Sequence, residues 1–179
     1  GVQPLLNALA QGRGLILGCT HIGLFHHALI QSRQLGTESE ILVVSGNRQQ
    51  SPLMVQRLAE VSGQKMRIVS ASTTSTLAIA RHLRRGGVVA TMLDLYVDSN
   101  LAFDVPFFGR PAATPAGIFQ LAVAAGSPIA PVCVTTDRAG RKSVEIDSVL
   151  HPIASAIDLA AETCARIERM VRHHAATWS

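Results

Sequence analysis

The stretch LILGCTHIGLFHH, residues 15–27, ends an apolar run in Thr20 and His21 and places His26 five positions further on. Histidine changes charge near neutral pH, so a histidine at the end of a strand can act as a general base for an attacking hydroxyl. A core strand that simply runs into a helix bearing imidazoles would show the same pattern. Other polar groups are therefore needed to distinguish the two interpretations.

Two further segments offer such groups. Asp94 lies at the end of the apolar run VVATMLDL, and Arg110 lies in the segment FFGRPAATP. In a parallel sheet, ligands bind at the carboxyl ends of the strands, so polar residues that follow different strands meet at one edge. A base, a carboxylate and an arginine are expected to converge there.

Metal and nucleotide sites are not predicted. The spacing HxxxxH has no obvious third ligand, and the sequence contains neither HExxH nor a closely spaced cysteine pair. Cys19 and Cys133 lie in apolar runs and are interpreted as core residues of a reducing compartment. The glycines of GRGLILG precede the strand, and no GxGxxG or GxxxxGK[ST] occurs. No cofactor is expected.

Composition favours a single domain, and its positive charge suits either an anionic partner or an ordinary solvated surface. The 179 residues are 47% hydrophobic but only 4% aromatic, and the net charge is +4. Basic residues are scattered, without an aromatic-interleaved stripe, so nucleic acid is not expected. No apolar run reaches the roughly 18 residues of a membrane span, and no signal peptide is evident. Because the chain begins with Gly, a preceding segment such as a membrane anchor is expected.

Apolar runs alternate with helical patterns along the chain. Strands are predicted at 14–20, 41–46, 66–71, 88–95, 128–136 and 143–150, and helices at 23–36, 51–63, 75–87, 116–126 and 155–175. Residues 96–115 contain three prolines and are predicted to form a long functional loop. DRAGR is predicted to turn the chain into an antiparallel edge strand. The fold class is α/β: a single domain over 1–179, with a mainly parallel sheet covered by helices on both faces and an antiparallel edge hairpin.

Three stretches resemble one family. GRGLILGCTHIGLFH, RGGVVATMLDL and VPFFGRPAATPAGIFQLAVAAGSPIAPVCV are similar to the late acyltransferases of lipid A biosynthesis, the lauroyl/myristoyl transferase branch of the lysophospholipid acyltransferase superfamily. The closing IERMVRHHAATW resembles the last helix and terminal Trp of that family. The similarity spans residues 12–178, whereas an N-terminal anchoring helix of full-length members has no counterpart.

The resemblance implies acyl transfer from an acyl-carrier-protein or acyl-CoA thioester to a hydroxyl, or an amine, of a lipid or other acceptor, without a cofactor. It implies a glycerolipid acyltransferase-like fold. It also implies a cytoplasmic protein or one bound peripherally to the cytoplasmic face of the inner membrane. The family motif is His, four residues, then Asp or Glu: His21 matches the base, but His26 stands at the acid position. Asp94, Phe108, Gly109, Arg110 and Thr114 match the other segments, with the last four expected to bind substrate.

The missing acid leaves three interpretations open. His21 acts as the base and is oriented by another group, for which Asp94 and a backbone carbonyl are the candidates. Alternatively, the chemistry serves a different acceptor, such as a more nucleophilic amine or a carrier-bound intermediate. In the third interpretation, catalysis is lost and the domain binds an acyl chain, carrier or partner protein. An enzyme predicts His21 in a cleft at the strand ends and within reach of an orienting acceptor.

Overall fold

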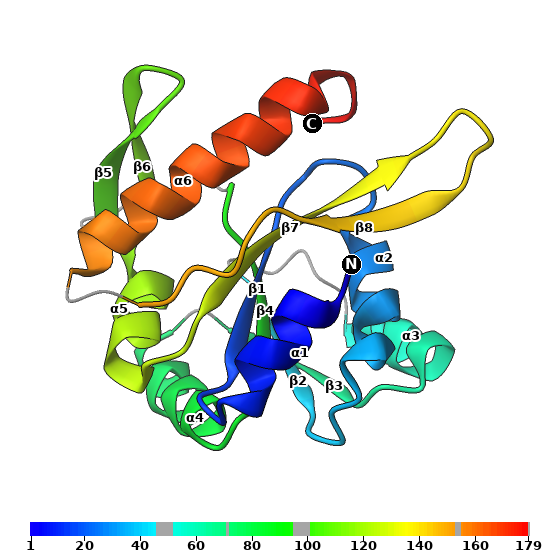
Figure 1. Ribbon diagram of the computed structural model, residues 1–179. Coiled ribbons are helices and arrows are strands. Elements are labelled where there is room, and N and C mark those ends of the chain that lie inside the picture. The colour runs from blue at the N-terminus through cyan, green and yellow to red at the C-terminus, as the bar shows by residue number, and fades with distance from the viewer. Residues whose placement is uncertain (46–51, 71, 95–100, 153–154, 179) are drawn as a thin grey trace.

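The computed structural model describes residues 1–45, 52–70, 72–94, 101–152 and 155–178. Its centre is a six-stranded sheet in the order β3-β2-β4-β1-β7-β8 (Figure 1). The bounds are β1 Leu15–Cys19, β2 Ile41–Ser45, β3 Met66–Ser70, β4 Val88–Met92, β7 Ile129–Thr136 and β8 Lys142–Ile146. All pairs are parallel except β7–β8, which is antiparallel. The predicted mainly parallel sheet with an antiparallel edge is confirmed.

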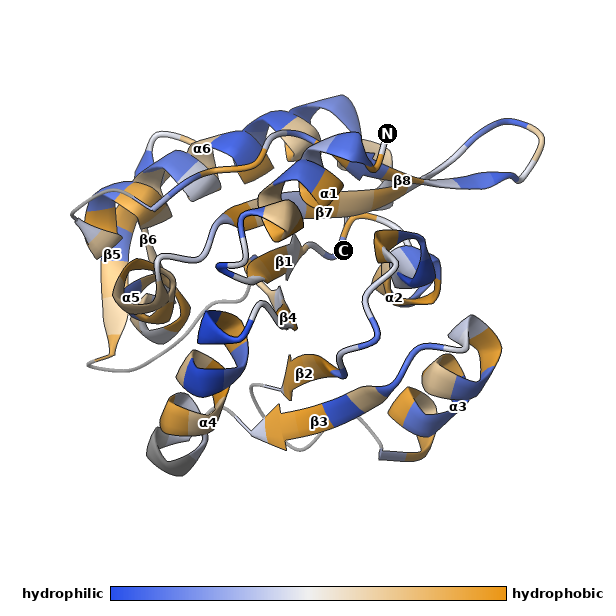
Figure 2. Cartoon of the chain, turned by 60° about the horizontal axis from the view of Figure 1, so that its bottom comes forward, coloured by the Kyte–Doolittle hydropathy of each residue, from blue (hydrophilic) through white to orange (hydrophobic). Residues whose placement is uncertain are grey.

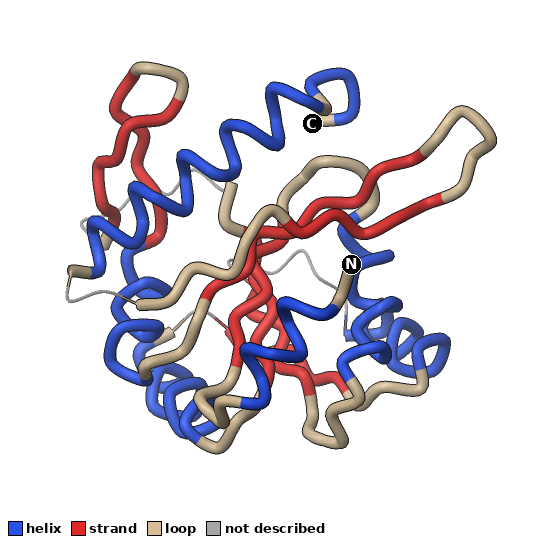
Figure 3. The backbone as a smooth tube through the Cα atoms, viewed as in Figure 1, coloured by secondary structure: helices blue, strands red, loops and turns tan. Residues whose placement is uncertain are grey.

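Helices cover both faces of this sheet (Figure 3). They are α1 Gln3–Ala10, α2 Phe25–Gln31, α3 Pro52–Ser62, α4 Thr73–Arg84, α5 Ala116–Ala125 and α6 Ala156–His173, with short 3-10 turns at Ser32–Leu35 (η1) and Ala175–Thr177 (η2). Alternate side chains of the strands feed two apolar clusters. Ile16 packs in the cluster that includes Phe119 of α5 and Ile167 of α6, whereas Leu17 packs with Leu5 of α1 and Leu29 of α2 and others. The inner strands β1, β2 and β4 are accordingly apolar along most of their length (Figure 2).

The predicted loop 96–115 is wrong over its described part. Residues 96–100 lie outside the described residues, and the rest forms a separate antiparallel hairpin of β5 Ala102–Phe107 and β6 Arg110–Pro115. Pro106 faces Pro111, and Ala102 faces Pro115. Counting from the two-residue turn, these prolines occupy non-hydrogen-bonded pairs, where the ladder requires no N–H. Prolines that suggested a loop are thus compatible with strands.

The hairpin turn depends on Phe108 and Gly109. Both residues have positive φ, 50° and 73°. Two consecutive positive φ values define a type I′ turn, which matches the twist of the flanking strands. Glycine adopts this conformation freely, but a bulky Phe does not, so other contacts must hold Phe108 in place. The hairpin runs beside α6 (Figure 1).

Other differences are local. The helix α1 was not predicted, although Pro4 in its first turn is a helix-start signal. The helix expected at 23–36 begins at Phe25 and continues through η1 to Gly36, whose left-handed φ of 62° ends it. The ends of three predicted strands, at 46, 71 and 95, and the start of one predicted helix, at 51, lie outside the described residues. In the part of the chain that the structure describes, we find no helix with the length and apolarity needed to cross a membrane.

Candidate active site

Parallel register brings His21 and Asp94 together. Strands β1 and β4 are neighbours, with Cys19 opposite Met92. Each strand is followed two residues later by a polar group, His21 after β1 and Asp94 after β4. The two residues therefore lie at the same level beyond the carboxyl edge of the sheet. This is the edge where ligands bind in parallel α/β sheets.

Asp94 is buried and accepts three N–H groups. Its Oδ1 lies 2.8 Å from Nδ1 of His21, and its Oδ2 accepts the backbone N–H of His21 at 2.6 Å. The indole Nε1 of Trp178 donates to the same Oδ2 at 3.1 Å. Only 1% of the Asp94 side chain is exposed, against 32% for His21. A buried carboxylate is costly unless it is hydrogen-bonded, and these three donors meet that requirement.

This contact fixes the chemistry of the imidazole. An ionised carboxylate is an acceptor only, so Nδ1 of His21 must be the donor, and the proton of the neutral ring lies on that nitrogen. Nε2 is then the basic nitrogen of the ring. A carboxylate that holds Nδ1–H in this way also stabilises the imidazolium that forms when Nε2 takes a proton. This geometry would suit a base with its orienting acid.

The loop that follows β1 is fixed on both sides of His21. Thr20 is fully buried, and both its N–H and its hydroxyl donate to the carbonyl of Val132 on β7. Two residues beyond His21, the N–H of Gly23 donates to the carbonyl of Thr177 at 3.0 Å. A Cβ on Gly23 would overlap the carbonyl oxygen of Val134, so this position needs glycine. The backbone of His21 is thus held between the sheet and the C-terminal turn.

His26 is directed to other partners. It lies in the first turn of α2, and its Nε2 contacts the sulfur of Met54 at 2.8 Å. Its ring packs against Phe25, with the ring centres 3.9 Å apart. Burial lowers the pKa of His26 below its ordinary value, so its neutral form is favoured. The residue at the family's acid position therefore has Met54, and not His21, as its hydrogen-bond partner.

The tip of the β5–β6 hairpin is linked to Asp94 through Trp178. The N–H of Phe108 donates to Glu168 of α6 at 2.7 Å, and its ring stacks on Trp178 with centres 6.2 Å apart. The guanidinium of Arg172 lies over the Phe108 ring, 4.9 Å from the ring centre. Because Arg172 also pairs with Glu168, the strained Phe108 is held by a closed set of contacts on α6. These contacts explain how a Phe is kept at positive φ.

Of the other predicted substrate-binding residues, Gly109 and Arg110 are exposed, whereas Thr114 is buried. Arg110 is exposed at the start of β6 and forms no ion pair within the described residues. Gly109 has a positive φ in the turn, and no protein atom lies within 4 Å of a Cβ built there, so its expected contact with substrate stays a prediction. Thr114 was expected to donate from a loop, but it lies on β6 and is buried. Burial raises the pKa of the Cys164 thiol, and the nearby Thr114 hydroxyl lowers it by a smaller amount. Within the described chain, the Thr114 hydroxyl has no well-formed hydrogen bond.

Two cavities lie beside α2. One, of about 490 Å³, is bordered by Leu24, His26, His27, Ile30, Gly140 and Lys142. The other, of about 300 Å³, lies between α1, α2 and the β7–β8 hairpin, and both apolar residues such as Leu5 and polar residues such as Gln31 line it. Neither is lined by His21 or Asp94. The cleft expected at His21 stays a prediction.

Sequence reasoning missed the role of Trp178. The residue was noted as part of the closing segment, but nothing in its surroundings indicated a hydrogen bond to Asp94. Its position depends on η2, which follows α6 and turns the chain back, and on a bridge between Ile22 and Trp178. The bridge places Trp178 directly beside Ile22, in the loop that carries His21.

Comparison with known families places this geometry in context. The family model of the bacterial lipid A biosynthesis acyltransferases matches residues 1–179. The chain belongs to this family. A comparison with curated protein sequences finds no significant match. The family match covers both motifs that supply His21 and Asp94 and the hairpin that supplies Arg110.

Proposed function

We propose that this member of the lipid A acyltransferase family is an active acyltransferase, with His21 as its general base and Asp94 as the acid that orients it. The observation that supports this most is the 2.8 Å contact between Nδ1 of His21 and the buried Oδ1 of Asp94. It supplies the orienting carboxylate that the sequence lacks at position 26. Of the three interpretations of the altered motif, the geometry favours the first.

In the proposed reaction the donor is an acyl thioester of acyl carrier protein or coenzyme A, and the acceptor is a hydroxyl of a lipid. Nε2 of His21 takes the proton of the hydroxyl as its oxygen attacks the thioester carbonyl. The C–S bond breaks, an ester C–O bond forms, and the proton passes from the imidazolium to the departing thiolate. Asp94 keeps its charge throughout and stabilises the imidazolium.

Arg110 is assigned to an anionic group of a substrate. It is exposed on the hairpin whose tip contacts Trp178, and no carboxylate of the described chain pairs with it. Guanidinium groups bind phosphate in a bidentate manner, and both donors and the phosphorylated lipid acceptors of this reaction class contain phosphate. An Arg110→Gln variant is expected to raise KM more than it lowers kcat.

The test is thioester consumption with acyl carrier protein and coenzyme A donors, each with hydroxyl and amine acceptors. His21→Ala should abolish acceptor-dependent release of thiol. His27→Ala is the matched control, because His27 lies on α2 and its ring contacts Gln31. Equal turnover in wild type and His21→Ala would exclude the proposed base.

A second candidate function is binding without catalysis. It is favoured by one observation, the replacement of the family's acid by His26, whose partners are Met54 and Phe25. In that case no donor is consumed by wild type with any acceptor, yet an acyl chain or an acyl carrier protein binds saturably. Acceptor-dependent turnover by wild type would exclude this candidate.

A further inference from the structure

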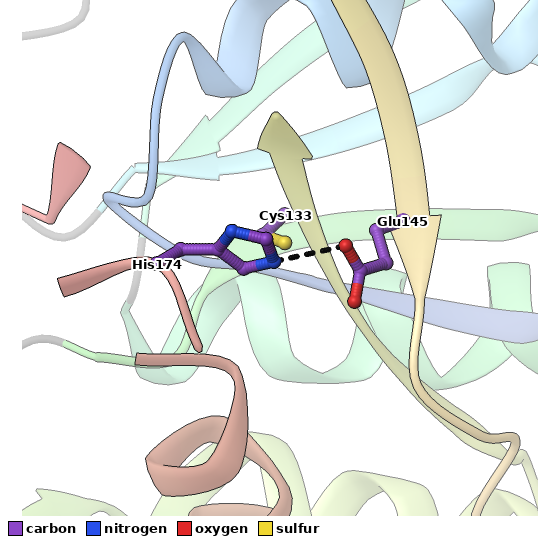
Figure 4. A group of neighbouring side chains, drawn as sticks. All are labelled: Cys133, Glu145 and His174. Atoms are coloured by element: carbon purple, nitrogen blue, oxygen red, sulfur yellow. Dashed lines mark hydrogen bonds and ion pairs between the residues drawn. The ribbon is translucent and has the colours of Figure 1, made fainter. Parts of the chain in front are cut away.

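Three side chains with metal-binding atoms meet at one end of the β7–β8 hairpin. The sulfur of Cys133, a carboxylate oxygen of Glu145 and a ring nitrogen of His174 all lie within 4.8 Å of one another (Figure 4). Nε2 of His174 is 2.9 Å from Oε2 of Glu145. None of these residues has a role in the proposed acyl transfer.

The fold brings these residues together from three elements. Cys133 on β7 and Glu145 on β8 are directly paired in the antiparallel register, so their side chains point to the same face of the sheet. His174 follows the last residue of α6, and its ring lies beside Cys133 and points toward Glu145 (Figure 4). Because the three positions are far apart in the sequence and form no spaced motif, sequence reasoning predicted no metal site and interpreted Cys133 as a core residue.

We propose that Cys133, Glu145 and His174 form a binding site for a divalent transition metal, with zinc as the best-matched ion. Thiolate, imidazole and carboxylate are the donors that zinc takes in proteins, and three protein ligands with one solvent ligand complete a tetrahedral shell. The proposal does not depend on acyl transfer.

The charges and burial fit such an ion. A thiolate and a carboxylate together balance a charge of +2, and the neutral imidazole adds none. Cys133 is buried, whereas the side chains of Glu145 and His174 are 49% and 25% exposed, so an ion can reach the sulfur from solvent past these two groups. In the metal-free protein, burial and then the Glu145 charge raise the pKa of the Cys133 thiol to about 12. A bound cation stabilises the thiolate and so lowers the pKa of the Cys133 thiol, and metal binding therefore releases the thiol proton.

The rearrangement needed is small. With zinc about 2.3 Å from sulfur and about 2.0–2.1 Å from nitrogen and oxygen, tetrahedral angles place the ligand atoms roughly 3.3–3.5 Å apart. The present separations, 2.9 Å between His174 and Glu145 and at most 4.8 Å for the group, reach these values through side-chain rotations. The hydrogen bond between His174 and Glu145 is then replaced by two metal bonds.

A metal here would also fix the C-terminal turn. The carbonyl of His174 accepts the N–H and the hydroxyl of Thr177, each at 2.9 Å. Trp178, the next residue, donates to Asp94. An ion that joins His174 to β7 and β8 would therefore tie the start of this turn to the central sheet.

The experiment is titration of the full, metal-free chain with Co²⁺, followed by competition with Zn²⁺. We expect a thiolate-to-cobalt charge-transfer band in the near ultraviolet at one Co²⁺ per chain, which Zn²⁺ removes. Cys133→Ser should abolish the band. Because changes outside the ligand shell already weaken metal sites by about 10- to 100-fold, Glu145→Gln and His174→Gln should weaken binding by more than about 100-fold.

Cys164→Ala is the matched control, because Cys164 is also buried but lies outside the group. It should keep the band. Glu145→Gln keeps the test decisive even if a change at buried Cys133 impairs folding, since Glu145 lies at the surface. Absence of a band in folded wild type, or a band that persists in folded Cys133→Ser, would overturn the proposal, whatever the outcome of the acyl-transfer assay.

Discussion

The indole N–H of Trp178 donates to Oδ2 of Asp94 at 3.1 Å, across 84 positions of sequence. The same oxygen accepts the backbone N–H of His21, while the other carboxylate oxygen holds the imidazole. Trp178 therefore helps to hold the acid of the proposed pair in place. Its ring also contacts Phe107 and Phe108, so the indole links the hairpin tip to Asp94.

Trp178→Phe should lower kcat while the KM for the acyl donor stays near its wild-type value. The variant keeps an aromatic ring against Phe108 but loses the N–H donor to Asp94. A hydrogen bond to a charged group is worth about 1.5–3 kcal/mol, which corresponds to a rate loss of about 10- to 100-fold. Steady-state kinetics measures this split. A rise in KM with unchanged kcat would assign Trp178 to substrate binding instead.

Asp94→Asn should retain the fold and lose most of the activity. The amide has nearly the same shape but no charge, so it neither fixes the reactive tautomer of His21 nor stabilises the imidazolium. The corresponding change in serine proteases lowers kcat by about 10⁴, and a similar loss is expected in the thioester assay. Asp104→Asn, at an exposed position of β5, is the control and should keep wild-type turnover. A loss of less than about tenfold in Asp94→Asn would mean that another group orients His21.

His26→Glu restores the family's acid at position 26, yet it should give no gain in activity. Nδ1 of His21 is already bonded to Asp94, and the side chain at position 26 is directed to Met54. We also expect His26→Gln to stay within about threefold of wild type, as for changes that alter free energies by about 0.5 kcal/mol. The thioester assay compares both variants with wild type. A large gain in His26→Glu would show that the replaced acid limits catalysis.

The pairing of His21 with Asp94 was within reach of the sequence, whereas their supports were not. Alternating apolar runs and helical patterns predicted the parallel sheet, with His21 directly after one strand and Asp94 at the end of another. Which strands are neighbours is decided by packing in three dimensions, and the adjacency of β1 and β4 is what makes the contact. The hairpin was missed because its prolines occupy positions that require no N–H. Trp178 was missed as a donor because its position depends on how the chain turns back after α6.

The free energy of unfolding should decrease as the pH falls through the ordinary pKa of histidine. Burial lowers the pKa values of His26 and His82 below the ordinary value of histidine. The unfolded chain then binds protons at a higher pH than the folded chain, so acidification through this range favours unfolding. Thermal melts between about pH 8 and about pH 5.5 should show this loss. The loss should be smaller in His26→Gln than in wild type or in His151→Gln, a change at an exposed histidine. If the melting temperature falls equally with pH in wild type, His26→Gln and His151→Gln, His26 is not a source of the pH dependence.

Two glycine substitutions should change stability in opposite directions. Gly117 lies in α5 at an ordinary helical φ with no atom within 4 Å of an added Cβ, so Gly117→Ala should stabilise the fold by about 0.5–1 kcal/mol. Gly109 has equally open surroundings but a φ of +73° in the type I′ turn, so Gly109→Ala should cost about 1–2 kcal/mol. Urea unfolding measures both. Because neither added Cβ would meet another atom, the difference between the two changes in unfolding free energy reports the backbone conformation alone. Similar effects at the two sites would mean that the turn does not hold Gly109 at positive φ in solution.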